Sequence, residues 1–192
     1  MTTINLHNFI ARSTENGPGV RAVIWVQGCS LHCSGCFNPD THDQTIRQLV
    51  SVEALAERIL SISEIEGITI SGGEPFLQAA ALAELCRGLH ERNLGIVVFS
   101  GFTFEQLTQT DNTNWNALLG LTDLLIAGPF VQELRCDLAL RGSQNQTLHF
   151  LSERYLALKT RLEYDSNSVE LFIDASGHIT ITGFPGQEWF KA

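Results

Sequence analysis

The chain has 192 residues, 44% of them hydrophobic, and a formal net charge of -9 at pH 7. That length suits one domain with a substantial core. The negative charge argues against a general nucleic-acid binder, because neutralising phosphates requires Lys and Arg. The first residues are too polar for a secretory leader, and no long apolar run follows them. We therefore expect a cytoplasmic protein that neither binds nucleic acid nor spans a membrane.

Short apolar strands alternate with helical segments over the first two thirds of the chain. In chain order we expect a strand at Arg21–Gln27, a helix at Val52–Ser63 capped by Ser51, a strand at Gly67–Ser71, a helix at Gln78–Arg92, a strand at Ile96–Ser100, short helices at Phe104–Gln109 and Trp115–Leu119, and a strand at Asp123–Ala127. This alternation predicts an α/β fold with a mostly parallel sheet. Because βαβ crossovers are right-handed, the sheet is either doubly wound or curled toward a barrel.

The pattern is looser in the last third of the chain. Thr147–Leu162 fits a strand or a helix equally well. Beyond it, Val169–Ile173 and His178–Thr182 flank a Ser176-Gly177 turn, which predicts a C-terminal β-hairpin. Neither a linker nor an internal repeat divides the sequence, so we expect a single domain.

Three of the five cysteines lie within eight residues, directly after the first predicted strand: Cys29, Cys33 and Cys36. An odd number of cysteines without a secretory leader does not resemble a disulfide framework. Thiolates are the usual ligands of iron–sulfur clusters, and three of them can bind three irons while the fourth iron stays open. The alternative is a structural zinc site with His32 as fourth ligand. That site would require a very short loop to turn His32 inward together with both neighbouring cysteines.

A second candidate segment ends the next predicted strand. Ser71, Gly72, Gly73 and Glu74 lie at the edge of the sheet where α/β folds bind ligands. Paired glycines allow a ligand to approach the backbone closely, and Glu74 offers a carboxylate. The alternative is an ordinary strand-to-helix turn.

The C-x3-C-x2-C spacing resembles the signature of the radical S-adenosylmethionine superfamily. The resemblance implies that Cys29, Cys33 and Cys36 hold a [4Fe–4S] cluster, whose open iron binds the methionine part of S-adenosylmethionine. It also implies that Ser71, Gly72, Gly73 and Glu74 bind this cofactor. The chain departs from many members at Gly35, since they have an aromatic residue just before the third cysteine.

Four further segments narrow the resemblance: Gly17–Arg21 (GPGVR), Phe99–Phe102, Asp123–Phe130 and Arg141–Gln146 (RGSQNQ). Taken in this order, they resemble the anaerobic ribonucleotide reductase activating enzymes, which belong to the glycyl-radical-enzyme activating enzymes. The similarity covers a core of about 16–146 and leaves a C-terminal extension of about 147–192 within the single domain of residues 1–192.

This resemblance implies an activity, a partner and additional site residues. The enzyme would cleave its cofactor to a 5′-deoxyadenosyl radical and generate a glycyl radical on a large partner, the anaerobic ribonucleotide reductase. A flavodoxin or ferredoxin would supply the electron, and a partial (β/α) barrel with one open side would admit the partner's glycine loop. Ser100, Gly101, Arg141 and Asn145 are further candidates for cofactor binding, and we expect no catalytic side chain beyond the cluster and cofactor.

Two other functions stay open at this point. One is a radical S-adenosylmethionine enzyme that acts on a small molecule or a peptide. The other is a non-catalytic protein with a structural zinc ion or an electron-transfer cluster. Cys86 falls on the apolar face of a predicted helix, so we expect it to be a core thiol in any of these readings.

Overall fold

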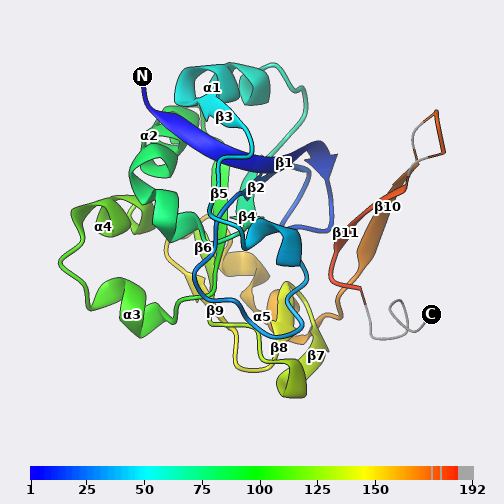
Figure 1. The fold of residues 1–192 in the computed structure, drawn as a ribbon. Coiled ribbons are helices and arrows are strands. Elements are labelled where there is room, and N and C mark those ends of the chain that lie inside the picture. The colour runs from blue at the N-terminus through cyan, green and yellow to red at the C-terminus, as the bar shows by residue number, and fades with distance from the viewer. Residues whose placement is uncertain (174, 178, 186–192) are drawn as a thin grey trace.

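The computed structural model shows a mixed α/β fold around one seven-stranded sheet (Figure 1). It describes residues 1–173, 175–177 and 179–185. The strand order is β3-β1-β2-β4-β5-β6-β9. The four central strands are parallel: β2 (Arg21–Val26), β4 (Gly67–Gly72), β5 (Gly95–Ser100) and β6 (Leu124–Ala127). The predicted mostly parallel sheet is therefore confirmed, and its carboxyl ends meet at one edge.

Antiparallel strands complete the sheet on both sides. β1 (Thr3–Ser13) pairs with β2 and with the short β3 (Leu49–Ser51), whereas β9 (Thr147–Phe150) pairs with β6. The sequence did not predict β1, because its few buried residues stand among exposed polar ones and give no clear apolar pattern. The ambiguous stretch 147–162 begins as strand β9 and continues into a 3-10 turn, η4 (Leu156–Leu158), and a short helix, α5 (Lys159–Tyr164).

The predicted helices are present, with small differences at their ends. They are α1 (Val52–Leu60), α2 (Ala79–His90), α3 (Phe104–Thr108) and α4 (Thr113–Leu119), with 3-10 turns η1 (Pro39–Thr41), η2 (Pro75–Gln78) and η3 (Gln132–Leu134). The Ser51 hydroxyl caps α1 by accepting a hydrogen bond from the backbone N–H of Ala54. The helix ends at Leu60, three residues earlier than expected, because the chain turns there toward β4.

Side chains from both faces of the sheet are buried. On β5, Ile96 and Val98 pack into the cluster that α1, α2 and α4 cover. Val97 points to the opposite face and packs with Tyr155 in a smaller cluster. Cys86, on α2, is fully buried in the first cluster, which confirms it as a core thiol. Burial on both faces explains why the central strands are almost continuously apolar.

Arg21 is the largest fully buried side chain among the described residues. Its guanidinium donates to the carbonyl oxygens of Pro18, Ile68 and Gly95 and to the hydroxyl groups of Thr69 and Tyr155. These bonds join the amino ends of β2, β4 and β5, which is the end of the sheet opposite the cysteines. The segment Gly17–Arg21 therefore has a structural role.

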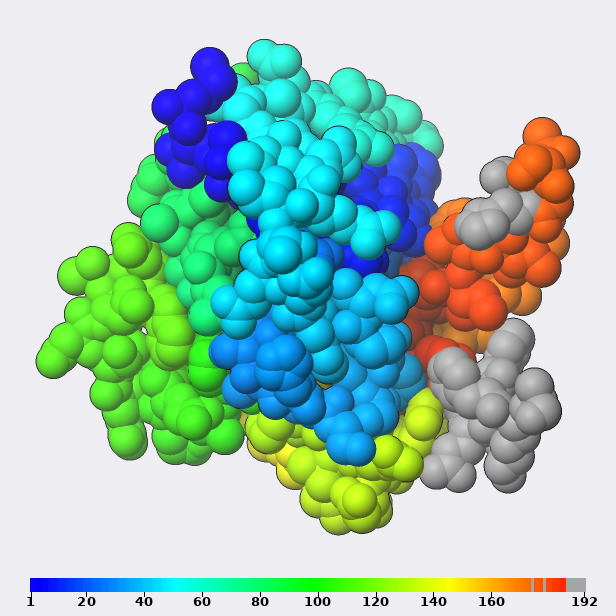
Figure 2. Space-filling model, in the orientation of Figure 1, coloured from blue at the N-terminus to red at the C-terminus, as the bar shows by residue number. Residues whose placement is uncertain are grey.

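Two antiparallel hairpins extend from the sheet. One consists of β7 (Arg135–Leu138) and β8 (Arg141–Ser143). The other is the predicted C-terminal hairpin of β10 (Val169–Ile173) and β11 (Ile179–Gly183), which projects from the body (Figures 1 and 2). His178, predicted to begin its second strand, lies outside the described residues. Within the described part of the chain, no helix is long and apolar enough to cross a membrane.

Candidate functional site

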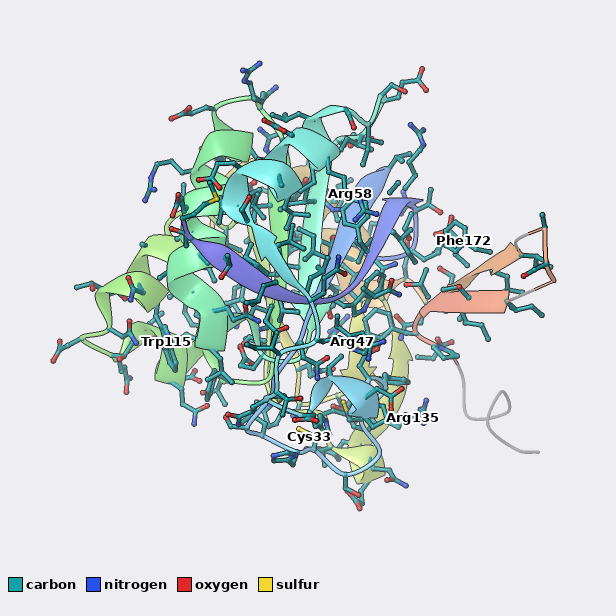
Figure 3. The ribbon with its side chains drawn as sticks, turned by 45° about the horizontal axis from the view of Figure 1, so that its top comes forward. Cys33, Arg47, Arg58, Trp115, Arg135 and Phe172 are labelled. Atoms are coloured by element: carbon teal, nitrogen blue, oxygen red, sulfur yellow. The ribbon has the colours of Figure 1, made fainter. Side chains whose placement is uncertain are left out.

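A cavity of about 350 Å³ lies at the carboxyl ends of the parallel strands. It brings together nine of the eleven residues that the sequence singles out: Cys29, Cys33, Cys36, Ser71, Gly72, Gly73, Glu74, Ser100 and Gly101. Figure 3 labels Cys33 at this end of the molecule, near Arg135. The cavity therefore combines the cysteine loop after β2 with the ends of β4 and β5.

Hydrogen bonds fix the cysteine loop at both ends. The backbone N–H of Gly28 donates to Thr41 O (2.8 Å), and the N–H of Cys29 donates to His42 O (3.3 Å). Near its middle, the N–H of Cys36 donates to Cys33 O (3.2 Å). Gly28 (φ 100°) and Gly35 (φ 70°) adopt left-handed conformations that side chains disfavour. The loop is thus closed on itself, and its three cysteines line the cavity.

The Gly-Gly-Glu segment packs directly on the start of the cysteine loop. Glu74 N–H donates to Gly28 O (2.8 Å), and Gly73 N–H donates to Val26 O (2.8 Å). A Cβ atom on Gly73 would lie 2.2 Å from Gly28 O, so only glycine permits this approach. The paired glycines therefore bring two parts of the site together, in addition to leaving space for a ligand.

The Glu74 carboxylate is only 1% exposed and accepts three hydrogen bonds. Oε1 accepts from Phe76 N (3.0 Å) and Ser100 Oγ (2.9 Å), and Oε2 accepts from Gly101 N (2.8 Å). Burial raises the pKa of Glu74 to about 7, although these three bonds act in the opposite direction. Glu74 thus links the end of β4 to the end of β5 and positions Ser100 and Gly101 at the cavity.

Burial affects the ionisation of two of the three thiol groups. Burial raises the pKa of Cys29 and of Cys36, so a positively charged metal centre is needed to hold them as thiolates. The N–H of Asn38 points at Cys36 Sγ (3.4 Å), and such contacts stabilise thiolate ligands. Among the described residues, no three His, Cys, Asp or Glu side chains are arranged to hold one metal ion.

His32, the fourth ligand of the alternative zinc site, contacts another histidine. Its ring packs edge-on against the ring of His42, with centroids 5.1 Å apart. Burial, with a smaller contribution from His32, lowers the pKa of His42. The backbone at His32 has a φ of 46°, which Asn, Asp and His tolerate better than most residues. The contact between the His32 and His42 rings therefore joins two parts of the cysteine loop.

Arg141 and Asn145 do not line the cavity, although their neighbours Gly142 and Gln146 do. The Arg141 guanidinium donates to backbone carbonyl oxygens, including Leu162 O (3.1 Å). Asn145 Nδ2 donates to Pro129 O (2.7 Å), while its buried Oδ1 has no partner among the described residues. These contacts favour a role in ordering the loop, and cofactor binding by either residue stays a prediction.

The sequence did not indicate two walls of the cavity. One comes from β1 and includes His7, Asn8 and Ile10. The other comes from the C-terminal hairpin and residues 180–185. Both depend on strand register and on docking over long sequence separations, which local patterns do not reveal. The polar residues His7 and Asn8 in an otherwise β-like segment were the available signal.

Comparisons with known proteins show similarity over most of the chain. Residues 15–149 match the family model described as a 4Fe-4S single cluster domain. The chain is 30% identical over 156 residues to the anaerobic ribonucleoside-triphosphate reductase-activating protein of Vibrio cholerae, which covers 76% of this chain and 97% of that protein. The protein of the same name from Enterobacteria phage T4 is 32% identical over 139 residues, covering 69% and 85%. A putative glycyl-radical enzyme activating enzyme of Haemophilus influenzae is 35% identical over 105 residues, covering 53% and 40%.

Proposed function

We propose a function on the premise that the chain belongs to the family of anaerobic ribonucleoside-triphosphate reductase-activating proteins. In this proposal the chain is a radical S-adenosylmethionine enzyme that generates a glycyl radical on an anaerobic ribonucleoside-triphosphate reductase. The observation that carries the proposal is the shared cavity of the three clustered cysteines and the Gly-Gly-Glu segment. The match to a 4Fe-4S domain favours the cluster over the structural zinc alternative.

In this proposal some residues bind the cluster and the cofactor, and others position the residues that line the cavity. Cys29, Cys33 and Cys36 would hold the cluster, and the backbone from Ser71 to Gly73 would face the S-adenosylmethionine. When bound, cluster and cofactor would supply the radical that removes a hydrogen atom from a glycine Cα. Glu74 would keep Ser100 and Gly101 at the adenosine or methionine side of the cavity through its hydrogen bonds. The apolar rings of Phe99 and Phe130 line the same cavity and would exclude water.

We infer that the sheet is a partial (β/α) barrel whose open side admits the glycine-bearing segment of the reductase. A protein substrate is consistent with the small size of the chain, since the partner can cover part of the site. A flavodoxin or ferredoxin would donate the electron, and the location would be cytoplasmic.

One anaerobic experiment tests the proposal. The purified chain is reconstituted with iron and sulfide and reduced, and its EPR spectrum is recorded with and without S-adenosylmethionine. We expect a [4Fe–4S] signal that changes on cofactor addition, with 5′-deoxyadenosine formed. Adding the anaerobic ribonucleoside-triphosphate reductase of the same organism should then give a glycyl-radical signal. One zinc per chain and no cluster signal would overturn the radical mechanism. Cofactor cleavage without a radical on the reductase would instead favour a small-molecule or peptide substrate.

A further inference from the structure

The C-terminal hairpin carries an exposed apolar face. In its antiparallel register, Leu171 lies opposite Ile181 and Ile173 lies opposite Ile179. Because side chains alternate along a strand, these four lie on the same face of the hairpin. Their exposed fractions are 47%, 48%, 69% and 54%, respectively. Clustered exposed apolar residues of this kind mark interaction sites more often than single exposed residues do.

The opposite face of the hairpin is the one that docks on the body. Thr182 accepts a hydrogen bond from Asn16 Nδ2 (2.8 Å) and is only 5% exposed. Glu170, opposite Thr182 in the register, accepts a hydrogen bond from Thr14 N (3.3 Å). The apolar face is therefore turned away from these contacts, and Figure 2 shows the hairpin standing out from the rest of the molecule.

The residues after β11 anchor the hairpin to the cysteine loop. The ring of Phe184 contacts Phe37, which directly follows Cys36, with centroids 6.0 Å apart, and it contacts Phe99 of β5 at 5.8 Å. Arg135 donates to Pro185 O (3.0 Å) and lies over the Phe37 ring at 4.7 Å. The base of the hairpin thus has a defined position relative to the site.

One residue of the apolar face also lines the cavity. Ile181 belongs both to the exposed face and to the cavity lining, together with its neighbours from Thr180 to Pro185. A polypeptide whose glycine reaches the cavity would pass beside this hairpin. The four residues of the face are uncharged, so a partner there would present apolar side chains.

We infer that the face formed by Leu171, Ile173, Ile179 and Ile181 is a docking surface for the partner polypeptide, next to its glycine-bearing segment. This inference rests on the proposed function and adds to it the surface that binds the partner. The hairpin lies beyond residues 15–149, which the 4Fe-4S family model matches.

The test compares two variants in the full-length, reconstituted chain. Leu171→Thr/Ile173→Thr removes apolar surface and places threonine, a β-branched residue that favours a strand, at both positions. Leu49→Thr is the matched control, because Leu49 is 51% exposed on the edge strand β3 and does not line the cavity. Three quantities are measured: 5′-deoxyadenosine formation without partner, glycyl-radical yield across concentrations of the reductase, and oligomeric state by anaerobic gel filtration.

We expect the double variant to cleave S-adenosylmethionine at the wild-type rate and to need about tenfold more reductase for half-maximal radical yield. Leu49→Thr should match the wild type in both assays. Wild-type concentration dependence in the double variant would overturn the docking surface alone. Impaired cofactor cleavage without partner would show that the face serves the cavity, and a change in oligomeric state would assign it to a second copy of the chain. A wild-type chain that cleaves the cofactor but never modifies the reductase would overturn the proposed function, and the docking surface with it.

Discussion

The Arg21 guanidinium donates a hydrogen bond of 2.7 Å to the hydroxyl of Tyr155, 134 residues further along the chain. Both side chains are buried, and the guanidinium also lies 5.4 Å from the centroid of the Tyr155 ring. Burial lowers the pKa of Arg21, while Tyr155 is the first of the groups that act in the opposite direction. The segment after β9 is thereby tied to the amino ends of three parallel strands.

Removing the Tyr155 hydroxyl should show how much its hydrogen bond with Arg21 contributes to the stability of the fold. Tyr155→Phe leaves a donor of the buried Arg21 without its partner, and we expect a loss of about 1.5–3 kcal/mol in the free energy of unfolding. Urea unfolding of the metal-free chain measures it. Tyr164→Phe is the matched control, because Tyr164 is 78% exposed. Equal stabilities for the two variants would contradict a structural role for the Arg21 network.

Cys33→Ala should abolish cluster assembly and cofactor cleavage, because the cluster would keep only two protein thiolates. Iron and sulfide content and 5′-deoxyadenosine release are measured after anaerobic reconstitution. Cys136→Ala is the control, since Cys136 is not among the cavity-lining residues. Near-normal 5′-deoxyadenosine release by Cys33→Ala would refute the ligand assignment.

Glu74 should make the metal-free chain less stable as pH rises. Burial raises its folded-state pKa from 4.5 to about 7, so the folded chain binds this proton more tightly than the unfolded chain does. The resulting stabilisation is complete below about pH 4.5 and is lost as pH rises through about 7. Glu74→Gln has no such proton. Urea unfolding at pH 5 and pH 8 should therefore show a larger pH-dependent loss for the wild type than for the variant, and parallel losses would contradict the assigned pKa.

Two glycine-to-alanine changes should have opposite effects. Gly73→Ala places a Cβ atom 2.2 Å from Gly28 O, so the cysteine loop must shift; we expect at least about 2 kcal/mol of destabilisation and poor cluster incorporation. Gly88→Ala, in α2, meets no atom within 4 Å and should stabilise the chain by about 0.5–1 kcal/mol. Thermal unfolding and iron content report both effects. Normal iron content in Gly73→Ala would argue against the close packing of the two loops.

The central part of the fold could be predicted because its signals are local. The apolar runs that became β2, β4, β5 and β6 are bounded by glycine-containing turns, and α2 shows a clear helical period. The long strand β1 was missed, because a half-exposed strand with Asn5, His7 and Asn8 lacks a continuous apolar pattern.

In the candidate site, too, the features with a local sequence signal could be predicted and the others could not. The cysteines and the Gly-Gly-Glu segment could be found from spacing and from their position after strands. The positioning role of Glu74 could not be found, since its partners Ser100 and Gly101 lie 26 and 27 residues away. The GPGVR segment was recognised only by resemblance, and its role follows from the burial of Arg21.

The contacts that hold the C-terminal hairpin join positions far apart in the chain, such as Asn16 and Thr182, 166 residues apart. The cysteine loop, in contrast, closes through bonds between near neighbours. A small two-stranded hairpin contributes little stability of its own. When the molecule fluctuates, the hairpin wall should therefore detach before the cysteine loop or the sheet unfolds. Detachment of the hairpin would widen the cavity on one side while the backbone hydrogen bonds of the cysteine loop stay in place.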